Sequence, residues 1–161
     1  PFPWVQVDTS NYIFDLGDKV FFDTNSYLIG NEVKAELRTY IPTLLKAKKT
    51  ENGKWIKRFI VEGFTDQAGS YTHNLALSTA RSRSVICALV SPTPESPTLT
   101  HEQLLDVQKY FSLGGFSSYS ILEDMKKSRR AAIRIEFWTL DEIEKGQKDP
   151  LLKPTFGVCQ G

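Results

Sequence analysis

The stretch GFTDQAGSYTHNLALSTARSRSV, residues 63–85, decides the fold because it joins a strand to a helix through a turn of small residues. The apolar run WIKRFIVEGF, residues 55–64, is typical of a buried strand. Ser70 favours the N-cap of a helix, and neither Gly nor Pro interrupts the chain until about Val90. One face of this helix carries apolar or small side chains and is predicted to pack on a sheet. Its members are Leu75, Ser78, Ser82, Val85, Ile86 and Leu89.

Two opposite charges, Asp66 in the turn and Arg81 in the helix, suggest a shallow pocket for a zwitterion, with both groups facing water. Helical side chains lean toward the N-terminus, so an extended Arg81 recovers part of the distance to the turn. Asn74, Leu77 and Arg81 recur at three- and four-residue steps on one strip of surface that leads to the turn. A carboxylate beside a guanidinium would hold the ammonium and the carboxylate of one ligand. The alternative is a plain ion pair or two unrelated surface charges.

The first part of the chain predicts a hairpin and a helix. Residues 1–11 form an irregular lead-in, and the run over 12–22 favours short strands or a hairpin with Gly17-Asp18 near its turn. Asn31 is predicted to cap a helix that continues to about Lys46, because apolar residues recur there at three- and four-residue steps.

The second half predicts a linker, a helix and a closing strand. The proline-rich stretch SPTPESPTLT, residues 91–100, is typical of a linker or an insertion. A capping-box pattern from Thr100 to Gln103 opens a helix over HEQLLDVQKYF, which Gly114-Gly115 either ends or follows with a tight turn. The run AAIRIEFW, residues 131–138, alternates as a strand.

This order of elements predicts an α/β (α+β sandwich) fold, in which helices pack on one face of a small mixed β-sheet. The chain has 161 residues, which is long enough for one substantial core. We expect one domain over 12–141, after the lead-in 1–11, with a tail or wrap-around segment over 142–161. No run approaches the roughly 18 apolar residues that a membrane helix needs.

Charge and cysteine content narrow the function classes. The formal net charge of +1 and the pI near 8.2 weigh against a dedicated nucleic-acid binder. Basic residues still cluster at 46–49, 54–58 and 126–130, and the plain interpretation of the first two clusters is solvated loops and helix ends. Cys87 and Cys159 make neither a disulfide framework nor a metal site. Either one bridge joins them, in a domain outside the cytoplasm, or Cys87 is a free thiol in the core.

Residues 63–85 resemble the signature of the OmpA-like peptidoglycan-binding domain, in which a strand leads into G-x-T-D-x-x-G-S and then N-x-x-L-S-x-x-R. The matching residues are Gly63, Thr65, Asp66, Gly69, Ser70, Asn74, Leu77, Ser78, Arg81, Ser82 and Val85. VFFDTNSYLI, residues 20–29, resembles the first-strand motif of the family, and SRRAAIRIEF, residues 128–137, resembles its closing N-R-R strand. The resemblance covers most of residues 19–138 and implies a βαβαβ-type architecture with an insertion after the second core helix.

The resemblance also implies a ligand. In that family, the aspartate and arginine that correspond to Asp66 and Arg81 hold the diaminopimelate residue of the peptidoglycan stem peptide. Thr65 and Asp66 would add main-chain contacts, Gly69 would let the backbone come close, and Asn74 would shape the turn or touch the ligand. The candidate peptidoglycan-binding residues are therefore Asp66, Arg81, Thr65, Gly69, Asn74, Leu77 and Arg130.

The chain departs from the family pattern around the rim of this site. Ser128 replaces the usual asparagine, and YFSLGGFSS, residues 110–118, stands where the family has a G-x-G-E turn but lacks the acidic residue. Of the two closing arginines, Arg130 is expected to reach the site and Arg129 to brace the sheet edge. The departures favour a specialised branch, such as MotB-like stator subunits or those of the Zorya phage-defence type, in which the domain tethers an ion-driven membrane motor to the wall.

The sequence and the resemblance together predict a noncovalent peptidoglycan anchor in the periplasm, without metal or cofactor, and not an enzyme. His73 and His101 are the only histidines and are expected at the surface, and Ser78 lacks a nucleophile-elbow context. We expect a homodimer that reaches the membrane through a segment before Pro1. The alternatives are a dimerisation or interaction module of a membrane complex and a nucleic-acid-binding module that uses the basic clusters.

Overall fold

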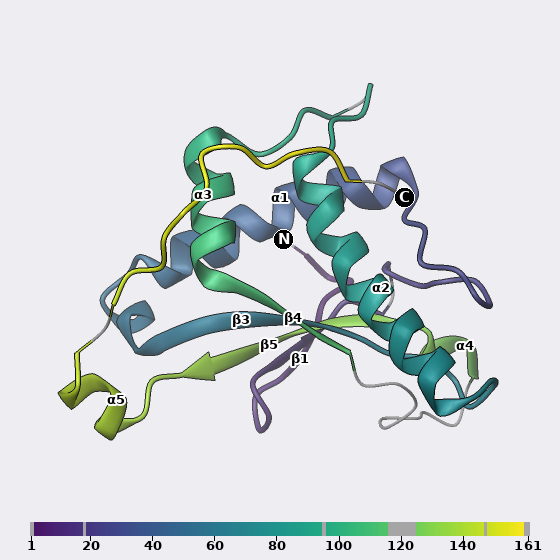
Figure 1. Ribbon diagram of the computed structural model, residues 1–161, viewed down its shortest axis with the longest axis horizontal. Helices are drawn as coiled ribbons and strands as arrows, with labels where there is room; N and C mark the ends of the chain where they lie inside the picture. Colours follow the sequence, from purple (N-terminus) through teal and green to yellow (C-terminus); the bar gives the residue numbers. More distant parts are fainter. Residues whose placement is uncertain (1, 18, 95, 116–124, 147, 160–161) are drawn as a thin grey trace.

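The computed structural model describes residues 2–17, 19–94, 96–115, 125–146 and 148–159 (Figure 1). A five-stranded mixed sheet has the order β1-β2-β5-β3-β4, in which β3 runs parallel to β4 and the other neighbours are antiparallel. The strands are β1 (Gln6–Asp8), β2 (Ile13–Asp15), β3 (Ile56–Gly63), β4 (Phe111–Gly115) and β5 (Ala131–Phe137). The helices are α1 (Asn31–Lys48), α2 (Tyr71–Val90), α3 (His101–Tyr110), α4 (Met125–Ser128) and α5 (Leu140–Glu144), with a 3-10 turn at Asn52–Trp55.

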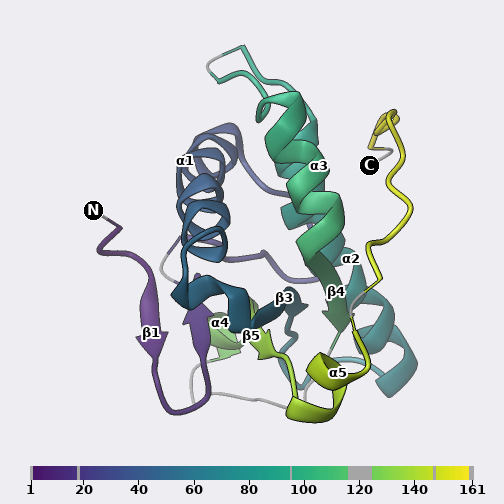
Figure 2. The same cartoon turned by 90° about the vertical axis from the view of Figure 1, so that its left-hand side faces the viewer.

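Helices α1, α2 and α3 cover the same face of the sheet, as the two views together show (Figures 1 and 2). The core lies between these layers, because alternate residues of β3 and β5 point toward the helices and are buried. Its central members are Phe59, Val61, Ile133, Leu37, Ile41, Val85 and Leu89. The predicted α/β architecture, with a small mixed sheet and helices on one face, is confirmed.

Helix α2 begins where the sequence predicts it, since Ser70 Oγ accepts a hydrogen bond from the backbone N–H of His73. It lies so close to β3 that a Cβ on Gly63 would come within 2.0 Å of the Ser78 carbonyl oxygen. The predicted packing face is wrong at Leu75, which is 37% exposed. Asn74 and Arg81 are buried on this helix, so its inner face is more polar than predicted.

The segment around Gly114-Gly115 differs from the prediction. The capping box of α3 is present, but the chain continues after Tyr110 directly into β4, which pairs with β3 so that Gly115 lies opposite Gly63. A Cβ on Gly115 would come within 2.4 Å of Thr79 Oγ1, so glycine lets β4 pass close to α2. These glycines neither end the helix nor form a tight turn.

The N-terminal hairpin begins earlier in the chain than predicted. β1 falls inside the predicted lead-in and pairs with β2. The Asp8 carboxylate closes the turn by accepting from the backbone N–H groups of Ser10 and Asn11. Gly17 lies after β2 in a separate turn, in which the Lys19 backbone N–H donates to the Leu16 carbonyl at 3.0 Å, so it is not the turn of the hairpin; Asp18 lies outside the described residues. Helix α1 starts one residue earlier than predicted, with Gly30 as its N-cap and Asn31 as its first residue.

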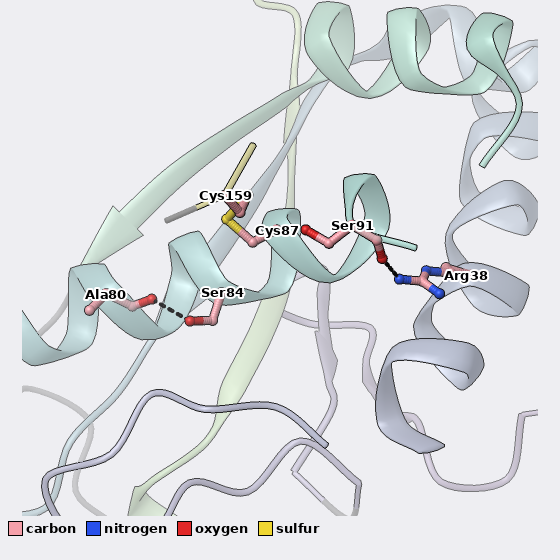
Figure 3. The surroundings of a disulfide bond; sticks show 6 residues. All are labelled: Arg38, Ala80, Ser84, Cys87, Ser91 and Cys159. Atoms are coloured by element: carbon pink, nitrogen blue, oxygen red, sulfur yellow. Dashed lines mark hydrogen bonds between the residues drawn. A yellow bond between two sulfur atoms is a disulfide. The ribbon is translucent and has the colours of Figure 1, made fainter. Parts of the chain in front are cut away.

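Two long-range ties hold the proline-rich segment and the C-terminal tail. Arg38 on α1 is buried and donates to the carbonyl oxygens of Ala88, Ser91 and Ser96. Cys87 on α2 forms a disulfide with Cys159, which fastens the tail beside the helix (Figure 3). Of the two alternatives for Cys87, the structure therefore contains the bridge. Among the described residues, no helix combines the length and the apolar character required to cross a bilayer.

Candidate functional site

Asp66 lies in the turn that leaves β3 and enters α2. Its Oδ1 accepts from the backbone N–H of Ala68 at 3.0 Å, and its Oδ2 accepts from Arg129 Nη1 at 2.9 Å. The Asn74 side-chain amide donates to the backbone carbonyl of Asp66 at 3.3 Å. Gly69 has a φ of +94°, a conformation that favours glycine, and it lets the chain turn into α2. The turn therefore holds the carboxylate in one defined position, and Asp66 is only 6% exposed.

Arg81 reaches the same turn from one side and is fully buried, with 0% exposure. Its guanidinium donates to three carbonyl oxygens: Nε to Ser26 at 2.9 Å, Nη1 to Phe64 at 2.8 Å and Nη2 to Asp23 at 3.0 Å. Arg81 thus ties the segment Phe22–Ser26 to the end of β3. Burial lowers the pKa of Arg81 to about 10, while the nearby Asp66 carboxylate opposes this shift and Arg129 adds to it.

The structure therefore meets only part of the expectation for Asp66 and Arg81. Arg81 reaches the turn that contains Asp66, because its Nη1 donates to the carbonyl of Phe64, two residues before Asp66, at 2.8 Å. The guanidinium does not face water, because Arg81 is fully buried and donates to backbone carbonyls of Asp23, Ser26 and Phe64. A buried arginine with three carbonyl acceptors is a structural anchor in this conformation.

The roles of the two closing arginines are the reverse of those predicted. Arg129 donates from Nη1 to Asp66 and from Nε to the Phe22 carbonyl, whereas Arg130 donates to Asp15 Oδ2 at 2.9 Å. The Arg130 guanidinium also lies over the ring of Phe64, 4.4 Å from its centroid. Successive side chains of an extended segment point to opposite faces, so only one of the two reaches Asp66. The Arg129 side chain remains 16% exposed, and it is the cation that a ligand at Asp66 would meet.

The other candidate residues surround this turn. Thr65 is buried, and its Oγ1 has no hydrogen-bond partner among the described residues. Leu77 is half-buried on α2. Asn25 belongs to the segment that resembles the family's first-strand motif, but it was not among the predicted site residues. It has a φ of +53°, and its Oδ1 lies 3.1 Å from His73 Nε2. This contact joins the start of α2 to the segment that covers Arg81.

Chemically, the arrangement offers one anchored carboxylate and one partly exposed guanidinium at hydrogen-bonding distance. Such a set suits a ligand that carries an ammonium and a carboxylate. Within the described ranges, no group of three or more His, Cys, Asp or Glu side chains is placed to hold a metal ion.

The sheet order, the helical layer and the Asp66 turn define the fold of an OmpA-like peptidoglycan-binding domain, a class that is not enzymatic. The chain is 36% identical over 162 residues to the Zorya protein ZorB of Escherichia coli O139:H28. That match covers 97% of this chain and 65% of the relative, so the chain spans about two thirds of the relative's length. No family model matches the chain.

Solved structures show the same fold at low sequence identity. The periplasmic domain of Helicobacter pylori MotB superposes with a TM-score of 0.52 and 17% identity, covering 83% of this chain and 86% of that one. An outer membrane protein from Borrelia burgdorferi B31 superposes with a TM-score of 0.53 and 21% identity, covering 81% of this chain and 94% of that one.

Proposed function

We propose that this domain binds peptidoglycan noncovalently, through the zwitterionic end of a diaminopimelate-containing stem peptide. The observation that carries the proposal is the pair of Asp66 and Arg129, a fixed carboxylate and a partly exposed guanidinium 2.9 Å apart. The OmpA-like fold and the match of residues 63–85 to the family signature support the same ligand.

Ligand binding would exchange one ion pair for two. The ammonium of the ligand would take the place of Arg129 at Asp66, and the released guanidinium would take the ligand carboxylate. The Thr65 hydroxyl, which is buried and has no partner among the described residues, would become a further polar contact only if the turn moved on binding. Arg81 would act indirectly, because it fixes the carbonyl groups that frame the site. Asn74, Leu77 and Gly69 would set the shape of the turn.

The proposed setting is the periplasm, with the domain anchoring a stator-like membrane complex to the cell wall, in a role in anti-phage defence. The similarity to Zorya protein ZorB supports this setting, and the Cys87–Cys159 bridge suits an oxidising compartment. Attachment to the membrane would come through a segment of the full-length protein before Pro1, and a homodimer would bind two stem peptides at once. Because one stem-peptide end is a small ligand, firm attachment would depend on such multivalency.

Sacculus pulldown of purified protein tests the ligand. Asp66→Ala should reduce the bound fraction at least tenfold, whereas Asp141→Ala should leave it unchanged, because Asp141 is an exposed carboxylate paired with Lys145 at the opposite end of the sheet. Circular dichroism of both variants establishes that the fold is retained. Equal binding by the two variants would rule out the Asp66 site. Binding to a nucleic acid that falls steeply with salt and is unaffected by Asp66→Ala would instead support the nucleic-acid alternative.

A further inference from the structure

A basic pocket with aromatic walls lies at the end of the sheet remote from Asp66. It has a volume of about 290 Å³ and is formed by the end of α1, the start of β3, the junction of α3 and β4, and the tail around Asp149. In Figure 1 this end carries α5 and the start of β3, whereas the start of α2 lies at the other end. The eight residues of β3, roughly 26 Å at about 3.3 Å per residue, separate the two regions.

Five cations line the pocket, and only some of them have carboxylate partners. Lys109 pairs with Asp149 at 2.7 Å, Arg58 pairs with Glu136 at 2.6 Å, and Lys57 pairs with Glu142. Lys48 and Lys148 have no carboxylate partner among the described residues. The five cations of the pocket therefore exceed their three carboxylate partners by two positive charges.

Two lysine ammonium groups of the pocket lie near the same aromatic ring. The Nζ atoms of Lys48 and Lys109 lie 4.9 Å and 5.4 Å from the centroid of the same ring, that of Tyr110. Lys57 Nζ lies 5.2 Å from the centroid of the Trp138 ring. Burial, together with the charge of Lys109, lowers the pKa of Lys48. An uncompensated ammonium in this position is destabilising unless an anion joins it.

We propose that this pocket binds a phosphate group. A phosphate monoester carries a charge of about −1.5 to −2 at neutral pH, which matches the two ammonium groups that lack carboxylates. Lysine binds phosphate as a compact point charge, and the hydroxyl groups of Tyr110 and Ser112 in the lining add donors without charge. The site is independent of the proposed wall ligand, because it shares no residue with the Asp66 turn.

The test is a titration of the whole chain with inorganic phosphate at low ionic strength, followed through backbone amide chemical shifts. Saturable shifts should centre on Lys48, Tyr110 and Ser112, and Lys48→Gln should weaken the apparent affinity about tenfold. Lys46→Gln is the matched control, since Lys46 is exposed on the same helix and does not line the pocket. Lys109→Gln is a second variant that should also weaken binding.

Vesicle flotation distinguishes the source of the phosphate. Binding of inorganic phosphate without preference for phosphatidic acid vesicles over phosphatidylcholine vesicles would assign a soluble ligand. A Lys48-dependent preference for phosphatidic acid vesicles would assign a lipid headgroup. The proposal is overturned if neither probe binds, or if Lys48→Gln and Lys46→Gln behave alike. Asp66→Ala should not affect either assay, so failure here is distinguishable from failure of the wall-binding function.

Discussion

Arg129 Nη1 donates to Asp66 Oδ2 at 2.9 Å, while Arg129 Nε donates to the Phe22 carbonyl at 3.0 Å. One guanidinium thus joins the turn after β3 to the segment that precedes α1. Because Asp66 already has a cationic partner, a ligand ammonium must compete for a site that the protein itself fills. The ion pair with Arg129 also offsets the cost of burying the Asp66 carboxylate.

Arg129→Gln should therefore reduce sacculus binding at least tenfold, because the ligand carboxylate loses its charged partner. Arg130→Gln, the neighbouring substitution, should retain binding, since Arg130 pairs with Asp15 and not with Asp66. Pulldown at a temperature where both variants are folded provides the comparison. Loss of binding in Arg130→Gln alone would restore the assignment that the sequence suggested.

Arg81→Ala should lower the free energy of unfolding by about 3 kcal/mol or more, because the carbonyl groups of Asp23, Ser26 and Phe64 lose a buried donor. Arg81→Lys should recover only part of this loss, since an ammonium does not reproduce the planar fork. Urea denaturation measures both effects. An Arg81→Ala variant with unchanged stability and abolished wall binding would show that Arg81 contacts the ligand directly.

Gly63→Ala should destabilise the protein by about 2 kcal/mol or more, because its Cβ would lie 2.0 Å from the Ser78 carbonyl and push α2 away from β3. Gly30→Ala is the control, since a Cβ there meets nothing within 4 Å and only the N-cap preference of α1 changes. Thermal melting of the two variants should separate them clearly. Similar melting temperatures would mean that the β3–α2 contact relaxes more easily than the structure indicates.

The Cys87–Cys159 disulfide closes a loop with a sequence separation of 72 residues, so its loss should cost about 2–4 kcal/mol. The double variant Cys87→Ser/Cys159→Ser should show this loss in urea denaturation and release the tail for limited proteolysis. Reductant should destabilise the wild-type protein by a similar amount and leave the double variant unaffected. A wild-type protein that is insensitive to reductant would contradict a contribution of the bridge to stability.

Local signals in the sequence were sufficient for most of the fold. Ser70 and Thr100 cap their helices as predicted, because capping depends on side chains within three residues. β4 was missed because its pairing with β3 is a long-range parallel contact, and because its two glycines are typical of turns. The hairpin was misplaced because Asp8 closes its turn through local hydrogen bonds that no Gly or Pro marks.

The candidate site was predictable in composition but not in geometry. The motif over residues 63–85 placed Asp66, Asn74 and Arg81 at one turn, and the structure brings them together. Which of Arg129 and Arg130 reaches Asp66 depends on the face of the closing segment that each side chain occupies. The backbone bridge between Arg130 and Phe21 sets these faces. The burial of Arg81 depends on Asp23 and Ser26, more than 50 residues away along the chain.

Acid should weaken the contact between α5 and β3. The hydrogen bond from Lys57, supported by that from the backbone N–H of Thr139, lowers the pKa of Glu142 from 4.5 to about 2. A carboxyl group with a lowered folded-state pKa stabilises the fold above its unfolded pKa, and this contribution is lost as the pH falls from about 4.5 to about 2. Glu142→Gln should therefore flatten the acid limb of the stability profile in that window.

The matched control for this effect is Glu144→Gln, two residues further along α5. Urea denaturation between pH 2 and pH 6 should show a smaller acid dependence for Glu142→Gln than for Glu144→Gln or the wild-type protein. Because Glu142 is at the surface, 0.5 M NaCl should reduce the difference by screening. If Glu142→Gln retains the full acid dependence of the wild-type protein, the Lys57–Glu142 pair does not persist in solution, and Lys57 keeps only its longer contact with Glu136 at 3.7 Å.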